Sequence, residues 1–197
     1  MVELQKLANV RAEGFLTPLI TGVASNLEFL RRLKTERRDS QELHSLLLSD
    51  LLANAKRRIE EGKFDDAAAR LYRLVEMIGQ IEIERICQAK TDNFPLEKIP
   101  ASLREEFEHR YRSTKDKQIK LGLEATYTIL KERGSEVGQR FFQERSRFDR
   151  LQQARNRSIL AHGVIPIEEE RVRDLLVFVS SLMPLQDEPR FPELTVE

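Results

Sequence analysis

Hydrophobic residues recur at helical spacing along most of the chain. Between residues 64 and 87 they fall at three- and four-residue intervals, which is the pattern of one buried helix face. The members of this face are Ala68, Leu71, Leu74, Val75, Ile78 and Ile81. Nowhere do apolar and polar residues alternate over the length of a strand. We therefore expect an all-α fold, a bundle of about six or seven helices.

Capping residues and glycines predict where the first helices begin and end. Residues 39–42, Asp-Ser-Gln-Glu, have the form of a capping box. The helix that they open would bury Leu46, Leu47, Leu51, Leu52 and Ile59. Gly62 ends this helix, since glycine tolerates the left-handed conformation that follows many helices. Phe64 begins the next helix, so the short connection predicts an antiparallel helical hairpin.

Similar signals continue through the second half of the chain. Residues 91–100 have the composition of a loop, and a second capping box at residues 102–105 begins a helix to about Arg112. Residues 116–132 repeat the helical pattern. Ser135 is predicted to cap the longest helix, which extends to about His162. Glutamates at 168–170 begin a last helix, which ends near Met183.

The same pattern suggests the domain organisation. Residues 1–39 are expected to form a helical arm or linker, because Gly14, Pro18 and Gly22 interrupt a pattern that is regular only from 25 to 33. Residues 40–185 are expected to form one helical domain, and residues 186–197 a C-terminal tail. A length of 197 residues suits one domain with an arm.

Charge and cysteine content narrow the class of protein. The 33 basic and 33 acidic residues cancel, so a nucleic-acid or membrane partner must be recognised by a local patch. Cys87, the single cysteine, excludes an internal disulfide and a CxxC metal or redox motif. The chain begins without a secretory signal, and its longest apolar-rich run, 175–185, is too short to span a bilayer. We expect a soluble cytoplasmic protein with no metal and no cofactor.

One stripe of the helix predicted from Ser135 changes character along its length. Its first members, Phe141, Phe148 and Leu151, are apolar. The next positions on the same stripe are Arg155, Ser158 and His162. Between residues 139 and 157 six arginines stand against two carboxylates, which is a basic segment in a neutral chain. The inward stripe thus ends in a permanent cation, a hydroxyl and a titratable imidazole.

These residue types suit phosphodiester cleavage. Arg155 can bind a phosphate through its planar fork, and His162 can exchange a proton near neutral pH. In RNA the 2′-hydroxyl supplies the nucleophile, so the protein needs only an acid, a base and a cation. Two copies of the chain across a twofold axis would supply two histidines. A second reading stays open, because Arg and His near a helix C-terminus are also favoured by the helix dipole alone.

The segment 155–163, Arg-Asn-Arg-Ser-Ile-Leu-Ala-His-Gly, resembles the signature of HEPN-domain ribonucleases. That signature is an arginine, a polar residue and, after a short interval, a histidine. The resemblance implies that Arg155, Asn156 and His162 are catalytic, with Arg155 as phosphate clamp, His162 as acid–base group and Asn156 orienting His162 or the phosphate. Arg150, Arg157 and Ser158 are the candidate RNA-binding residues.

Residues 51–73 are similar to the helical hairpin of CRISPR-associated CARF–HEPN proteins. This resemblance implies a homodimeric, metal-independent endoribonuclease of antiviral defence that cleaves single-stranded RNA. In such proteins a separate CARF domain binds cyclic oligoadenylate, and this chain has no segment with that pattern. It is therefore either part of a longer protein or a stand-alone HEPN protein.

Two further readings of the motif remain open. A HEPN toxin restrained by a nucleotidyltransferase antitoxin would carry the same catalytic residues. Alternatively, the chain has the same fold without catalytic activity and is a helical module that only binds RNA or protein.

Overall fold

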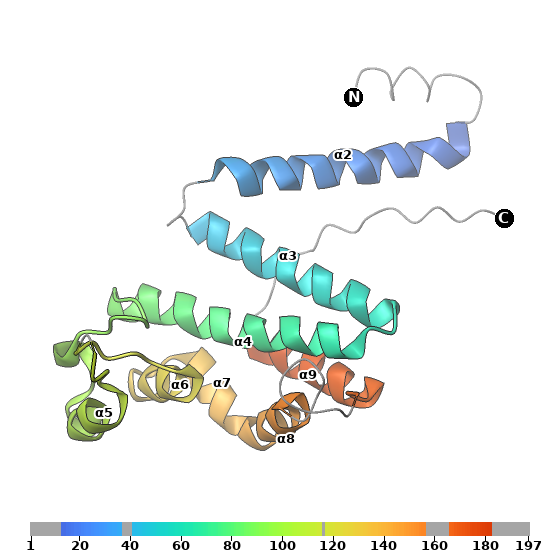
Figure 1. Ribbon diagram of the computed structural model, residues 1–197. Helices are drawn as coiled ribbons and strands as arrows, with labels where there is room; N and C mark the ends of the chain where they lie inside the picture. The colour runs from blue at the N-terminus through green and yellow to red at the C-terminus, as the bar shows by residue number, and fades with distance from the viewer. Residues whose placement is uncertain (1–12, 37–40, 116, 157–165, 183–197) are drawn as a thin grey trace. The chain divides into compact units, whose positions relative to one another are not determined.

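The computed structural model describes residues 13–36, 41–115, 117–156 and 166–182. Regular structure in these ranges is helical, and the only β-type pairing is a bridge between Arg112 and Ile119. The all-α prediction is therefore confirmed. The α-helices within these ranges are α2 (Glu13–Thr35), α3 (Gln41–Glu60), α4 (Phe64–Cys87), α5 (Arg104–Tyr111), α6 (Leu123–Glu132), α7 (Glu136–Gln143), α8 (Arg145–Asn156) and α9 (Glu169–Leu182). Figure 1 shows them along the chain.

Two compact units divide the chain, with the described residues up to Asn54 in one and those from Ala55 onward in the other. In the first unit, α2 begins at Glu13, twelve residues before the regular pattern that the sequence shows. The glycines and the proline weaken that pattern without preventing the helix, because propensity is only a weak local preference. The capping box at residues 39–42 lies partly outside the described residues.

Helix α3 buries a slightly different face from the one expected. Leu46, Leu52 and Ile59 are buried as predicted, whereas the Leu47 prediction is wrong, because that residue is 37% exposed. Leu48 is buried instead, at 1% exposure. Leu48, Leu52, Ala55 and Ile59 follow at intervals of four, three and four residues, which keeps one stripe of the helix inward.

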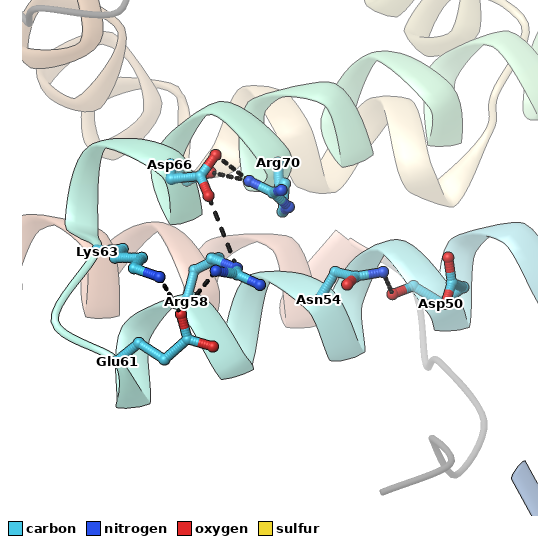
Figure 2. Close-up of polar contacts among 7 residues, drawn as sticks. All are labelled: Asp50, Asn54, Arg58, Glu61, Lys63, Asp66 and Arg70. Atoms are coloured by element: carbon cyan, nitrogen blue, oxygen red, sulfur yellow. Dashed lines mark hydrogen bonds and ion pairs between the residues drawn. The ribbon is translucent and has the colours of Figure 1, made fainter. Parts of the chain in front are cut away.

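The predicted hairpin between α3 and α4 is confirmed. Gly62 has a φ of +68°, and Lys63 N–H donates to the Arg58 carbonyl at 2.8 Å, so the turn closes as the glycine predicts. Figure 2 shows the ion pairs around this turn, where the Arg58 guanidinium lies 2.6 Å from Glu61 and 3.7 Å from Asp66. A hydrogen bond from Lys63, aided by the charge of Arg58, lowers the pKa of Glu61.

Helix α4 is the central element of the larger unit. It packs against α6, α7, α8 and α9, which lie along one side of it in Figure 1. Its buried residues include Ala68, Leu71, Leu74, Val75 and Ile78 from the predicted face, and Ile81 is only half-buried. Cys87 is buried at the end of the helix, and burial raises the pKa of its thiol. The sequence therefore identified this face almost completely.

Two helix starts were predicted wrongly. Ser102 does not cap α5, because it lies inside a 3-10 turn, Ala101–Leu103, and α5 begins at Arg104 without a side-chain cap. Residues 117–122 are not helical, and α6 begins at Leu123. Ile119 and Leu121 are buried while Lys120 is exposed. This period of two is that of extended chain, and Phe94 N–H donates to the Ile119 carbonyl at 2.9 Å.

The single long helix predicted from Ser135 to about His162 is also wrong. Ser135 caps α7 as predicted, but this helix ends at Gln143, its C-cap Glu144 has φ −102° and ψ 12°, and α8 starts at Arg145. Phe141 and Phe148 are nevertheless both buried, at 1% and 2% exposure, one on each of the two helices. Residues 157–162, the rest of the predicted helix, lie outside the described residues.

Aromatic rings hold α6, α7, α8 and α9 together. Phe141 stacks on Tyr127 with ring centroids 4.0 Å apart and contacts Phe148 at 5.2 Å. Phe178 of α9 lies 5.4 Å from Phe148. The Tyr127 hydroxyl donates to the Val75 carbonyl of α4 at 2.7 Å, so this buried ring has a polar partner.

Gly138 is required where α7 crosses the end of α6. A Cβ atom at this position would lie 2.4 Å from the Lys131 backbone nitrogen and 2.6 Å from the Leu130 carbonyl carbon. We expect Gly138→Ala to lower the free energy of unfolding by about 1–3 kcal/mol, because backbone atoms must move apart. Urea unfolding measures the effect. Gln139→Ala, at the exposed neighbouring position, is the matched control, and equal stability of the two variants would contradict the packing described.

Candidate functional site

The segment that carries the predicted catalytic residues starts from a polar anchor on α4. Ser135 Oγ accepts the Gly138 N–H at 3.4 Å and donates to Glu82 Oε1 at 2.7 Å. The Glu82 carboxylate also accepts from Arg85 Nε at 2.7 Å, and its side chain is only 14% exposed. The hydrogen bonds from Arg85 and Ser135 hold the pKa of Glu82 below its ordinary value despite burial.

Helix α8 presents two polar faces. Arg145, Asp149, Gln152 and Asn156 follow at intervals of four, three and four residues and share one face. Arg147 and Arg150 lie on another face, where α8 packs against α9. Phe148 lies between these faces and fixes the helix in the core.

Only some of the predicted site residues belong to the part of the chain that the structure describes. Arg155 and Asn156 form the end of α8, and Asn156 is exposed. Arg150, five residues earlier on the same helix, is exposed. Arg157, Ser158 and His162 lie outside the described residues, so their proximity to Arg155 stays a prediction.

The arginines of α7 and α8 form a weaker basic patch than their number suggests. Arg140 pairs with Glu136 at 3.3 Å, and Arg147 pairs with Glu144 at 2.8 Å. Arg145 Nη2 lies 2.9 Å from a carboxylate of α6, Glu124. Carboxylates from the same helices and from a neighbouring helix thus offset much of the charge that the sequence concentrates here.

A recess of about 220 Å³ lies between α8 and α9. Its charged lining is Arg147, Arg150, Glu168, Glu170, Arg171 and Asp174. Arg171 pairs with Glu168 at 3.1 Å. Arg150 thus faces acidic residues of α9 in this recess, and any RNA phosphate that it binds must compete with them.

A second recess, of about 250 Å³, lies along the other polar face of α8. Tyr72, Tyr111, Glu124, Arg145, Asp149 and Gln152 contribute to its lining. Sequence reasoning missed these residues. The spacing of Arg145, Asp149 and Gln152 was a usable signal, but nothing local in the sequence connects them with Tyr72 or Tyr111.

The chain on the far side of the motif is also attached to α4. Ile167 is buried, and its N–H donates to Asp65 Oδ2 at 3.5 Å. The other oxygen of this carboxylate, Oδ1, is buried without a hydrogen-bond partner among the described residues. The segment 135–167 is therefore fixed near both ends to the same helix.

Other kinds of site receive no support from the residues that the structure describes. They contain no group of three or more His, Cys, Asp or Glu side chains placed to share a metal ion. In the same ranges we find no helix with the length and apolar character needed to cross a membrane.

Comparison with known proteins gives one finding for this chain. The family model described as the Csm6 HEPN domain matches residues 36–186, which is more than half of the sequence. A search of curated proteins finds no match. The matched range contains α3–α9 and both halves of the Arg155–His162 motif.

The Glu82 anchor predicts how stability depends on pH. Because its pKa is lowered in the folded protein, Glu82 contributes stability above the unfolded pKa of about 4.3, and this contribution is lost as the pH falls through the lower folded value. We expect Glu82→Gln to cost about 1.5–3 kcal/mol at pH 7 and clearly less at pH 3. Chemical denaturation at both pH values measures the difference.

Glu84→Gln is the control for this experiment. Glu84 lies on the same helix, and its side chain makes no hydrogen bond or ion pair with the other described residues. A cost for Glu82→Gln that is the same at pH 3 as at pH 7 would show that the carboxylate charge does not hold the anchor.

Proposed function

Because the chain belongs to the Csm6 HEPN-domain family of ribonuclease type, we propose that it is a metal-independent endoribonuclease that cleaves single-stranded RNA. The 2′-hydroxyl of the substrate attacks the adjacent phosphate, and a cyclic phosphate remains on the product. Arg155 binds the phosphate and offsets its developing charge. His162 transfers the proton, and Asn156 orients His162 or the phosphate.

One observation carries this proposal. Arg155 and Asn156 close helix α8, a helix that Phe148 fixes in the core of a chain with a Csm6-type HEPN match. A rigid support is what a phosphate clamp requires, because small displacements of a catalytic group reduce the rate strongly. The exposed Asn156 also leaves this helix end accessible to a substrate or to a second copy of the chain.

We propose a homodimer with a composite site as the active form. A single chain supplies one histidine in the motif, whereas the reaction requires both a proton acceptor and a proton donor. Two copies related by a twofold axis supply both and bring two arginines to one phosphate. The CRISPR-associated character of the family favours a role in antiviral defence, with cyclic oligoadenylate acting through a separate CARF domain.

Cleavage of end-labelled single-stranded RNA in EDTA tests the proposal. We expect His162→Ala and Arg155→Ala each to reduce cleavage on the order of 10²–10⁴-fold, because each removes an acid–base or charge-stabilising group. Products with cyclic-phosphate ends would identify the attack by the 2′-hydroxyl.

His109→Ala is the matched control, since His109 is an exposed histidine of α5 with no role in the proposed reaction. The proposal fails if a folded, dimeric His162→Ala protein cleaves at the parent rate. RNA binding without cleavage by the parent would favour a non-catalytic module instead.

A further inference from the structure

The second recess, the one lined by Tyr72 and Tyr111, has aromatic walls. Each of these rings packs against a buried phenylalanine. The Tyr72 ring stacks on buried Phe148 at 5.7 Å with an interplanar angle of 25°. The Tyr111 ring packs edge-to-face on buried Phe107 at 4.9 Å. The Arg110 guanidinium lies 5.4 Å from the centre of the Tyr111 ring. These contacts give the recess rigid, flat surfaces of the kind on which a planar ring stacks.

Polar groups between the aromatic walls are oriented by one another. Arg145 lies 2.9 Å from Glu124 and 3.4 Å from Asp149, so one guanidinium holds two carboxylates. The Gln152 amide donates to the Tyr72 hydroxyl at 3.3 Å. The side chains of Glu124 and Asp149 stay 55% and 43% exposed. Their oxygens therefore remain available to hydrogen-bond donors of a ligand.

The recess is close to the proposed catalytic residues. Gln152 and Asn156 are four residues apart on α8, which places them just over one turn, about 6 Å, from each other along the helix. Arg155 lies within the same turn. The helix end that carries Arg155 thus lies next to the recess along α8.

The charge and volume of this recess suit a nucleobase better than a phosphate. Arg110 and Arg145 are balanced by Glu124 and Asp149, so the recess has no excess positive charge for an anion. Its volume of about 250 Å³ is below the roughly 300–1,000 Å³ of pockets for drug-sized ligands, so it suits a single ring system. Carboxylates accept from exocyclic amino groups, and a glutamine amide pairs with an adenine edge.

We propose that this recess binds one unpaired nucleobase of the RNA substrate and favours a base with an exocyclic amino group over uracil. This inference rests on the proposed function only in taking RNA as the molecule that is bound. The base stacks between the tyrosine walls, and Asp149 and Gln152 bind its polar edge.

Binding of fluorescent oligo(A), oligo(C) and oligo(U) by the full chain carrying His162→Ala tests the proposal without cleavage. We expect oligo(A) and oligo(C) to bind more tightly than oligo(U). Gln152→Ala and Asp149→Asn should each reduce that preference by roughly 5- to 150-fold, which corresponds to the usual discrimination of a good base contact. Binding of oligo(U) should change little in these two variants.

Gln153→Ala is the matched control, because Gln153 is the adjacent exposed amide outside the recess. Circular dichroism shows whether each variant is folded. If Gln152→Ala does not fold, the isosteric Asp149→Asn variant carries the test. Absence of the preference in the parent, or its survival in folded Gln152→Ala and Asp149→Asn proteins, overturns the proposal. The parent protein, which retains His162, could also show the base preference and yet fail to cleave RNA. That result would contradict the nuclease proposal and support the base site.

Discussion

The stacking of Phe141 on Tyr127 is the contact on which the arrangement of the larger unit depends. With its centroid 4.0 Å from Tyr127, 5.2 Å from Phe148 and 6.0 Å from Phe178, the Phe141 ring joins α6, α7, α8 and α9. The Tyr127 hydroxyl extends this cluster to the backbone of α4. Such close ring contacts require specific side-chain orientations, so they determine the direction in which α8 leaves the core.

Helix α4 is hydrogen-bonded to both ends of segment 135–167, which carries the motif. Glu82 near its C-terminal end holds Ser135, and Asp65 in its first turn holds Ile167. Between these attachments the helical chain is interrupted at Glu144, which divides it into α7 and α8. The motif arginine thus belongs to a helix with fixed packing on one side and accessible polar residues on the other.

Local patterns were reliable wherever a helix faces the core with a complete stripe. The burial of Leu71, Leu74 and Ile78 was predictable, because a 3.6-residue period leaves little choice about which face is inward. The Gly62 turn was predictable for a similar reason, since few residues accept its positive φ. The break at Glu144 was not, because nothing in its neighbouring residues disfavours a continuous helix.

For the candidate site, the sequence by itself determined the motif and the family, because both depend on residue types at fixed spacing. Only the tertiary structure decided that Arg140, Arg145 and Arg147 are paired with carboxylates, including Glu124 of another helix. It also decided that Tyr72 and Tyr111 meet Gln152 at one recess. The physical reason is that charge compensation and concave surfaces arise between helices distant in sequence, and a periodic pattern records only the face that each helix buries.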